Sequence, residues 1–437
     1  MNDKNTRANS KGLFPLILFL ILYFTCGIIF SNFSTMPLLV AMVISFLITL
    51  LVFPKEKKSS VIQTYCKGAG QPTIMMLVVI YILSGAFSAS ISAIHGSDLI
   101  ALNCMYFLPK NMILPGMFLI GALLSFSMGS SMGAATALMP VALSIVSHSN
   151  VSTPLACGIV VSGVIAGDNL SFISDTTVAS AAVTDTDIKD KFAESLCLAF
   201  IPALITLIML LFVPVECKVD TSANVPVINL LPVIIVIFLS VRGMSVIPVL
   251  AIGTVCSFMI GICQNLFTVS EFLATIHSGI MNLEEMALIA VCAGGLIGLA
   301  QEYGGIQWIC EKISTASRTK RFSRISIAVT TAILDIATAN NTMAIITCGP
   351  IASNICETQD ISRSKVSAIL GYFSTITNGL VPYAGHLMAV SGLSNISPMS
   401  VIPYVWYDLI GFISGIIWLW FEPEKYLIFT KKEENHD

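Results

Sequence analysis

Carboxylate, amide and hydroxyl side chains are concentrated in one stretch, residues 163 to 187, whose flanks are apolar enough to lie in a bilayer. A carboxylate near a bilayer centre costs about 2.5–3.5 kcal/mol on insertion scales, so intramembrane carboxylates normally face a cavity or pathway. Their oxygen atoms are ligands that hard cations prefer. The stretch therefore predicts a cation-binding site at membrane depth. Its seven candidate ligands are Asp168, Asn169, Ser171, Ser174, Asp175, Thr176 and Thr177.

These side chains need a backbone that points them at one place. Gly163 and Gly167 precede the cluster, and its many small polar residues favour a helix that unwinds and exposes backbone carbonyl and amide groups. Broken helices at mid-membrane form the ion and substrate sites of secondary transporters. The alternative is that Asp168 and Asp175 only cap helix ends at a membrane surface. Apolar residues on both sides of the cluster favour the intramembrane interpretation.

The whole chain has the composition of a polytopic membrane protein. Of its 437 residues, 55% are hydrophobic and 11% charged, and the mean hydropathy is +0.87; soluble domains have about 25% charged residues. The net charge of −3 argues against nucleic-acid binding. We interpret the first apolar run as a retained helix, because no small-residue cleavage site follows it. The sequence predicts no cofactor, since metal-centre and nucleotide motifs are not found.

Eight apolar segments are long enough to cross a bilayer. They lie at about 13–30, 36–53, 73–94, 195–213, 226–240, 244–263, 284–302 and 401–421. Four further apolar segments are interrupted by polar residues, at 112–148, 155–184, 324–356 and 364–390. An offset of 210 residues aligns the four interruptions in pairs, placing Asp168 on Asn378 and Ser130 on Asn340. Such a period predicts an internal repeat.

Basic residues indicate how the two halves are oriented. The loop after the second helix is rich in lysine, whereas its counterpart, 264–282, has no Lys or Arg; the next pair of loops, 95–112 and 303–324, shows the reverse. Cytoplasmic loops carry the excess of Lys and Arg, so the halves have opposite topology. The basic residues behind this are Lys55, Lys57, Lys58 and Lys67 in the first loop and Lys312, Arg318, Lys320, Arg321 and Arg324 in the fourth.

The predicted fold is therefore an all-α polytopic membrane protein with two inverted-topology repeats, each with a re-entrant hairpin and a broken transmembrane helix. We expect ten crossing segments and two hairpins, with both termini cytoplasmic. The predicted divisions are a cytoplasmic tail (1–12), the first repeat (13–214), an external linker (215–225), the second, inverted repeat (226–422) and a second cytoplasmic tail (423–437).

Irregular backbone at membrane depth must be buried or line a water-filled cavity, so the four breaks are expected to share one site. This adds the hairpin tips and the second linker to the candidate ligands: Ser130, Ser131, Asn340, Asn341, Thr342, Asn378 and His386. Only the first half is expected to bring carboxylates, Asp168 and Asp175, as transient cation ligands. His386 is a candidate proton carrier because the reference pKa of histidine is about 6.5; a lone histidine is more often structural.

Other charged residues near the breaks are given structural roles. Asp335, before the second hairpin tip, is interpreted as a packing or capping residue. Lys189 and Lys191, after the broken segment, are expected in a solvated loop. With no Lys or Arg expected in the breaks, the site favours a bare cation.

The run GDNLSFISDTTVASAAVTDTDI, from Gly167 to Ile188, resembles a characteristic segment of the NhaC family of sodium/proton antiporters, with its Gly-Asp pair and Ser-Asp-Thr-Thr motif. The resemblance implies exchange of Na⁺ for H⁺ by a multi-pass protein of the bacterial inner membrane. Competition of the two ions for one carboxylate would couple them, since burial favours the protonated form.

Alternatives remain open at this point. Relatives of this family also move organic acids or amino acids with sodium or protons, and a channel is a remote third reading. A membrane enzyme is disfavoured: the Gly-x-Gly-Asp pattern of intramembrane aspartyl proteases fails because residue 165 is Ile. The expected partners are Na⁺, H⁺ and the lipid bilayer, and the sequence leaves a homodimer open.

Overall fold

The computed structural model describes residues 8–30, 35–52, 58–96, 99, 109–216, 226–314 and 319–421, and this part of the chain consists of helices and connecting segments without strands. The all-α prediction is confirmed. Predictions for most of the first tail, for the second tail, for most of the linker and for Lys55, Lys57 and Arg318 lie outside the described residues.

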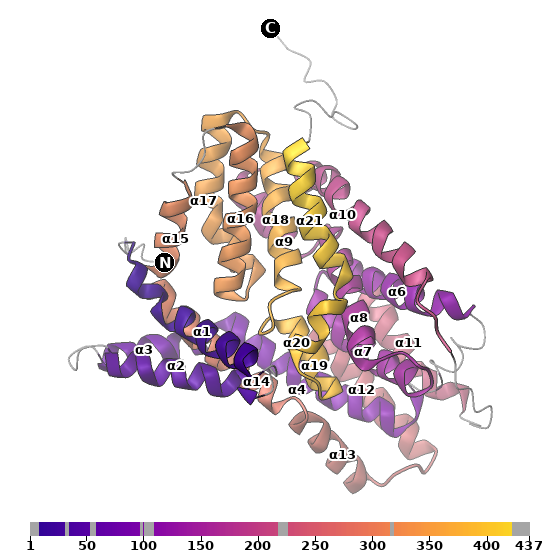
Figure 1. Cartoon of the computed structure of the whole chain (residues 1–437). Helices are drawn as coiled ribbons and strands as arrows, with labels where there is room; N and C mark the ends of the chain where they lie inside the picture. The colour runs from indigo at the N-terminus through magenta and orange to yellow at the C-terminus, as the bar shows by residue number, and fades with distance from the viewer. Residues whose placement is uncertain are drawn as a thin grey trace.

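The helices of the first half are η1 Ser10–Leu13, α1 Phe14–Ile29, α2 Leu38–Val52, α3 Lys58–Ala69, α4 Pro72–Ala93, η4 Lys110–Met112, α6 Ile113–Met128, α7 Ser131–Ser147, α8 Thr153–Asn169, α9 Asp175–Thr184 and α10 Ile188–Leu211. Those of the second half are η5 Val227–Leu230, α11 Leu231–Val241, α12 Val246–Cys263, α13 Val269–Met281, α14 Glu284–Glu302, α15 Gly305–Ser314, α16 Lys320–Thr338, α17 Asn341–Gln359, α18 Arg363–Asn378, α19 Gly385–Ser394, α20 Pro398–Val401, η6 Ile402–Tyr404 and α21 Trp406–Phe421. Figure 1 shows their arrangement.

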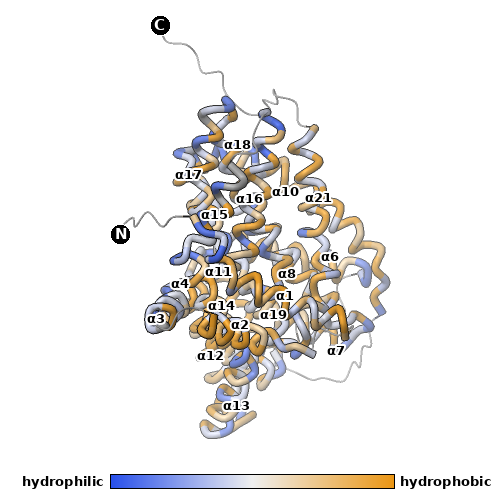
Figure 2. The backbone as a smooth tube through the Cα atoms, turned by 60° about the vertical axis from the view of Figure 1, so that its left-hand side comes forward, coloured by the Kyte–Doolittle hydropathy of each residue, from blue (hydrophilic) through white to orange (hydrophobic). Residues whose placement is uncertain are grey.

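The helices have the length and hydropathy of membrane spans. In the described part of the chain, six helical segments are long and apolar enough to cross a bilayer, and Pro398–Tyr404 with Trp406–Phe421 forms a seventh that bends by 58°. Figure 2 shows hydrophobic residues along most helices and hydrophilic residues collected toward the ends of the molecule. The protein is therefore a multi-pass membrane protein.

The helix boundaries repeat at the offset found in the sequence. α7 begins at Ser131 and α17 at Asn341, and α9 and α19 have the same length, 10 residues. The packing is reciprocal: α9 packs against α17 and α18, and α19 against α7 and α8. Likewise α3 packs against α14, and α13 against α4. Reciprocal contacts of this kind are those of an approximate two-fold axis; the opposite orientation of the halves in the membrane stays a prediction.

Each broken segment therefore crosses between the halves. α8 packs within the first half, on α6 and α7, but α9 leaves it and packs on the second; α18 and α19 do the converse. The interruption in each segment is the place where the chain changes sides, so the two breaks come together at the centre.

Three predicted loops contain helices. α3, α13 and α15 fall in segments that we expected to be irregular, because they are too short or too polar to be scored as spans. α13 begins with a capping box, in which Thr268 and Glu271 satisfy each other's backbone amides. α13 also approaches α4 closely: a Cβ on Gly85 would lie 2.2 Å from the carbonyl oxygen of Gly279. Small residues at such contacts let membrane helices pack tightly.

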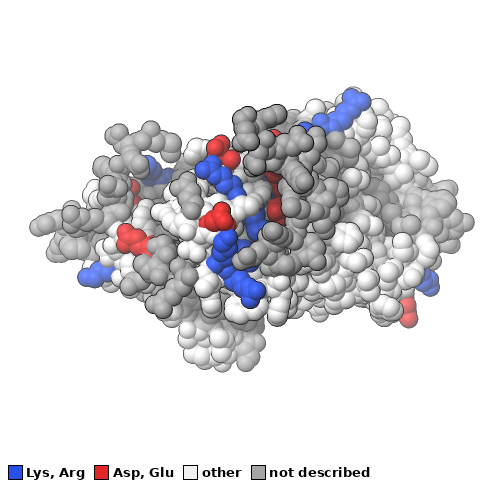
Figure 3. Space-filling view, turned by 90° about the horizontal axis from the view of Figure 1, so that it is seen from above, with Lys and Arg blue, Asp and Glu red and all other residues white. Residues whose placement is uncertain are grey.

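Charged residues collect at one end of the bundle. Lys320 pairs with Asp360 (3.1 Å) and Arg363 with Asp185 (3.3 Å), joining the ends of α16, α17, α18 and α9. Figure 3, a view of the molecule from above, shows basic and acidic side chains alternating across the centre of this face. These pairs are exposed and contribute little to stability, but they mark the end of the molecule with the basic character expected of a cytoplasmic surface.

Candidate functional site

The two hairpin tips have the same backbone design. α6 ends at Gly129 in the left-handed conformation (φ 64°), and Ser130 then caps α7 by accepting a hydrogen bond from the amide of Gly133 (3.3 Å). α16 ends at Ala339 (φ 47°), and Asn340 caps α17 by accepting from the amide of Met343 (2.9 Å). Left-handed backbone costs an alanine about 1–3 kcal/mol, a strain that glycine avoids in the first half. The tips thus combine a helix stop with a helix start.

We call the interruptions between α8 and α9 and between α18 and α19 the first and second crossing breaks. Both are shorter than the sequence predicts. α8 continues through Asp168 and Asn169, and α9 starts at Asp175, so only residues 170–174 are irregular where we expected Asp168 to Thr177. In the second half, residues 379–384 are irregular, between Asn378 and Gly385. Asp168 therefore ends one helix and Asp175 begins the next.

One cavity of about 120 Å³ is lined by both hairpin tips and by the helix ends that flank both crossing breaks. A water molecule needs about 10–15 Å³ on this measure, so several water-sized molecules or a partly hydrated ion fit. Ten of the sequence-predicted residues line it: Ser130, Ser131, Asp168, Asp175, Thr176, Asn340, Asn341, Thr342, Asn378 and His386. Segments more than 200 residues apart in the chain thus converge on one polar space.

The other four predicted ligands hold the first break together and are absent from the cavity wall. Asn169 donates to the hydroxyl oxygen of Tyr407 (3.1 Å), and Ser171 donates to the carbonyl of Phe126 (2.8 Å). Ser174 caps α9 by accepting from the amide of Thr177 (3.2 Å). Thr177 donates to the carbonyl of Ser171 (2.8 Å). Ser174 and Thr177 thus satisfy backbone groups at the interruption, while Asn169 and Ser171 tie it to α21 and α6.

The two carboxylates of the first break differ in burial. Asp168 is only 4% exposed, whereas Asp175 is exposed. Asp175 occupies the first turn of α9, where the helix dipole favours a negative charge. The hydroxyl of Thr176 hydrogen-bonds Asp168. Asp168 is thus the deep carboxylate of the cavity, and Asp175 lies nearer its opening.

Lys191 corrects the sequence analysis. α10 begins at Ile188, capped by Asp187, so Lys191 is helical and only 2% exposed, where we expected a solvated loop. Its ammonium group donates to Thr177 Oγ1 (2.8 Å), and Thr177 Oγ1 lies 3.1 Å from Ser174 Oγ. The lysine stem lies against Gly371 of α18, where an added Cβ would be 3.2 Å from Lys191 Cε. The buried ammonium group of Lys191 therefore lies next to the first break, although the break itself contains no Lys or Arg.

Asp335 is a second correction, because the second half does bring a carboxylate to its break. Asp335 is fully buried, and Asn378 Nδ2 donates to both of its oxygens, at 2.9 and 3.2 Å. Asp335 does not belong to the cavity wall, but Asn378 does. The offset pairs Asp335 with Ser125 and Asn378 with Asp168. In the first half the carboxylate is on the crossing segment, at Asp168, whereas in the second half it is on the hairpin helix α16, at Asp335.

Two further polar groups lie near the breaks. His386 lines the cavity, is buried, and its Nε2 has no hydrogen-bond partner in the structure. Asp408, which sequence reasoning did not select, is fully buried, and its oxygens accept no hydrogen bond from another residue. It lies beside Gly379, at the start of the second break. The sequence did contain a signal for Asp408, because it is an acid within the apolar segment 401–421. We assigned it no role.

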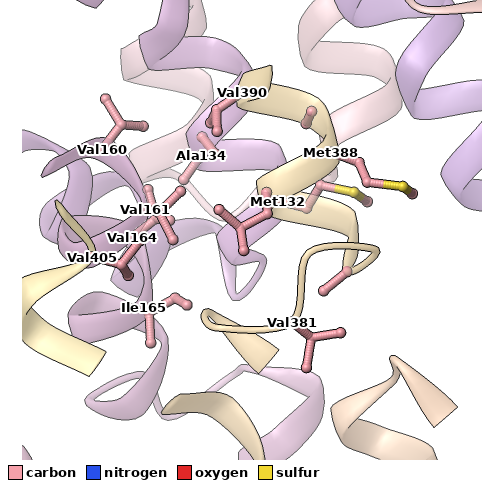
Figure 4. Close-up of a cluster of buried hydrophobic side chains, with 14 of the residues drawn as sticks. Met132, Ala134, Val160, Val161, Val164, Ile165, Val381, Met388, Val390 and Val405 are labelled. Carbon is pink, nitrogen blue, oxygen red and sulfur yellow. The ribbon is translucent and has the colours of Figure 1, made fainter. Parts of the chain in front are cut away.

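An apolar cluster packs α19 against α7 and α8 beside the cavity (Figure 4). Met132, which follows the first hairpin tip, belongs to this cluster and also lines the cavity. The labelled members are Met132, Ala134, Val160, Val161, Val164, Ile165, Val381, Met388, Val390 and Val405. Van der Waals packing of these side chains, which drives helix association inside a membrane, holds the break of one half on the helices of the other.

Comparison with known proteins gives consistent matches over the whole chain. The sequence model described as "Na+/H+ antiporter family" matches residues 6–215 and 218–422. The chain is 24% identical to the Na(+)/H(+) antiporter NhaC of Bacillus subtilis, over 94% of this chain and 98% of that protein. It is 20% identical to the malate-2H(+)/Na(+)-lactate antiporter of the same organism, over 96% of each chain. It is 23% identical to the arginine/ornithine antiporter ArcD of Halobacterium salinarum, over 69% of this chain and 70% of that one.

Proposed function

The chain belongs to the Na⁺/H⁺ antiporter family, and from that premise we propose that it exchanges Na⁺ for H⁺ across a bacterial inner membrane, with the central cavity as the ion site. The family resemblance noted from the Gly-Asp and Ser-Asp-Thr-Thr run is confirmed by these matches. Its members are transporters, so transport and not catalysis is the activity to derive.

The observation that carries the proposal is the cavity itself. It is the meeting point of two hairpin tips and two broken helices, and it combines a buried carboxylate with hydroxyl and amide oxygens. Na⁺ prefers oxygen ligands. Asp168 is the ligand that binds Na⁺ and is protonated in its absence, and Thr176 and Asp175 supply neighbouring oxygens.

Exchange follows from competition for Asp168. A cation in this site gains a strong interaction with the carboxylate, because the effective dielectric of a protein interior is well below that of water. A proton removes that interaction. The same group therefore carries one ion or the other. Exchange becomes obligatory because the empty site, a bare carboxylate, is too costly to move through the membrane unneutralised.

The orientation that we propose follows the basic residues. The end of the bundle with Lys320, Arg363 and Lys365 faces the cytoplasm, and α13 lies toward the outside. With both termini cytoplasmic, the two halves have inverted topology, and the approximate two-fold axis lies in the membrane plane.

A second candidate function is exchange of small carboxylates or amino acids. The observation in its favour is Lys191, a buried positive charge close to the first break, together with relatives named as malate/lactate and arginine/ornithine antiporters. Against it, Lys191 does not line the cavity, whereas Asp168 and Asp175 do, and two carboxylates repel an anion. The bare cation is favoured.

Flux measurements in proteoliposomes test the proposal. With an imposed pH gradient and a lumenal pH-sensitive dye, addition of Na⁺ should dissipate the gradient, while addition of K⁺, malate, lactate, arginine or ornithine should not. A gradient that responds to one of the organic solutes and not to Na⁺ alone would establish the second candidate instead.

Asp168→Asn is the matched variant for this assay, because it keeps the side-chain shape and removes the charge. Na⁺-dependent dissipation should be lost with unchanged insertion and unchanged size-exclusion behaviour. Asp187→Asn, at the exposed start of α10, is the control and should retain flux.

A further inference from the structure

We infer that Lys191 is an internal competitor for the cation site: its buried ammonium group, held beside the first break by Thr177, repels Na⁺ at Asp168 and thereby lowers the affinity for Na⁺. This inference rests on the proposed function, since it needs Na⁺ to bind at Asp168. It assigns a specificity-setting role to a residue outside the cavity wall.

The first argument is the energetic position of Lys191. A buried ammonium group is costly unless it is paired and hydrogen-bonded. The ammonium group donates a hydrogen bond to a neutral hydroxyl, Thr177 Oγ1 (2.8 Å). This hydroxyl in turn donates a hydrogen bond to the backbone carbonyl of Ser171. A hydroxyl does not neutralise the charge. Ser174 connects this hydroxyl to Asp168, because Ser174 Oγ lies 3.1 Å from Thr177 Oγ1 and 3.4 Å from the backbone carbonyl oxygen of Asp168. Asp168 is therefore the buried acid near the ammonium group.

The second argument is how the chain keeps Lys191 in place. Thr177 belongs to α9 and Lys191 to α10, and the hydrogen bond between them spans the turn that joins these helices. The lysine stem lies against α18, where Gly371 leaves room for it. The position that the offset pairs with Gly371 is Val161, and the one paired with Lys191 is Val401. The charge therefore belongs to the first half only, like the cavity carboxylates.

Competition follows from these two arguments. With Na⁺ on Asp168, the ammonium group and the ion are both close to one carboxylate and repel each other. Removal of the positive charge should relieve that repulsion. Two unit charges a few ångströms apart interact by more than 1.4 kcal/mol at an effective dielectric of about 20, so Na⁺ affinity should rise by about tenfold or more.

The test measures the KM for Na⁺ and the maximal rate separately, in the proteoliposome assay, for wild type, Lys191→Met and Lys191→Arg. Lys191→Met should lower the KM for Na⁺ by about tenfold and slow turnover, because bound Na⁺ leaves less readily. Lys191→Arg keeps the charge and should have a KM close to that of wild type. Lys189→Met, at an exposed position of the same helix, is the control.

The outcomes separate the possible failures. A purely structural lysine would give fewer active molecules with an unchanged KM, and an unchanged or raised KM for the folded Lys191→Met protein overturns the inference. Lys191→Gln, which retains a donor to Thr177, serves as a second neutral variant if Lys191→Met yields little folded protein, and the same lowered KM is required of it. If wild type shows no Na⁺-dependent proton movement, the proposed function fails, and the inference fails with it.

Discussion

The two crossing breaks have the same backbone and different chemistry. In both, the last turn of a helix carries an acid or its amide, Asp168 or Asn378, and a ten-residue helix begins a few residues later on the other half. The first break supplies the carboxylates of Asp168 and Asp175 to the cavity. The second supplies Asn378, Gly385 and His386, while the nearby carboxylate of Asp335 lies outside the cavity wall and is bonded to Asn378.

This difference shows that the packing of the helices around the site and the charge of the site are set by different residues. Reciprocal packing of α9 and α19 on the opposite halves needs only matched lengths and apolar faces, so it is common to both breaks. Ion coupling needs an unequal distribution of charge, because two identical carboxylate sites would place too much negative charge in one small cavity. The second half thus resembles a neutral copy of the first.

Exchange of the charges between the breaks is expected to have the largest effect. Asp168→Asn should reduce Na⁺-dependent proton flux by at least about 100-fold, since the ion loses its charged ligand. Adding Asn378→Asp should not restore flux, because the new carboxylate would face Asp335 and repel it. Flux in the double variant near the wild-type level, measured in the proteoliposome assay at matched protein content, would show that the two breaks are interchangeable.

Replacement of Asp335 should have an intermediate effect. Asp335→Asn removes a charged acceptor from Asn378, and hydrogen bonds to charged groups are worth about 1.5–3 kcal/mol. We expect a lower thermal stability and a several-fold rise in the KM for Na⁺, with residual exchange. Ser125→Ala, at the paired position of the first half, is the control. Complete loss of exchange in a folded Asp335→Asn protein would mean that the second half carries a coupled ion as well.

The helix caps at the hairpin tips should matter less and equally in the two halves. Ser130→Ala and Asn340→Ala each remove an N-cap, at a cost of about 1 kcal/mol. The exchange pair Ser130→Asn with Asn340→Ser keeps both caps and should retain stability and most of the flux. Thermal unfolding followed by size-exclusion chromatography measures the first, and flux the second. A collapse of flux in the exchange pair at full stability would assign the tip amide to the ion.

Orientation is tested without any expected effect on activity. In a cysteine-free background, Ser278→Cys on α13 should react with an impermeant thiol reagent added outside, and Arg321→Cys on α16 only with reagent added from the cytoplasmic side. Labelling of both from one side is incompatible with inverted halves.

Much of this arrangement could be predicted from the sequence. Polar interruptions in apolar runs located all four breaks, and the offset of 210 residues located their pairing, because both are properties of residue type and spacing. The convergence of Ser130, Asn340, Asp168 and Asn378 on one cavity follows from the rule that irregular backbone must be buried together.

The rest depended on contacts that spacing does not determine. The start of α10 is set by the Asp187 cap, and without that boundary the burial of Lys191 could not be foreseen. The pairing of Asp335 with Asn378 depends on the angle between α16 and α18. The packing of α9 and α19 on the opposite halves is determined by tertiary contacts, since the sequence of an apolar ten-residue helix does not specify one packing partner.

The central claim, that Na⁺ and H⁺ compete for Asp168 in the central cavity, is tested most directly by proton release from purified protein. Addition of Na⁺ in weakly buffered detergent solution should release protons from wild type, and the apparent Na⁺ dissociation constant should rise by up to about tenfold for each unit of decreasing pH while the site is protonated. Asp168→Asn should release none, and K⁺ should release none from wild type. Na⁺ binding without proton release, or release that persists in Asp168→Asn, would contradict the account.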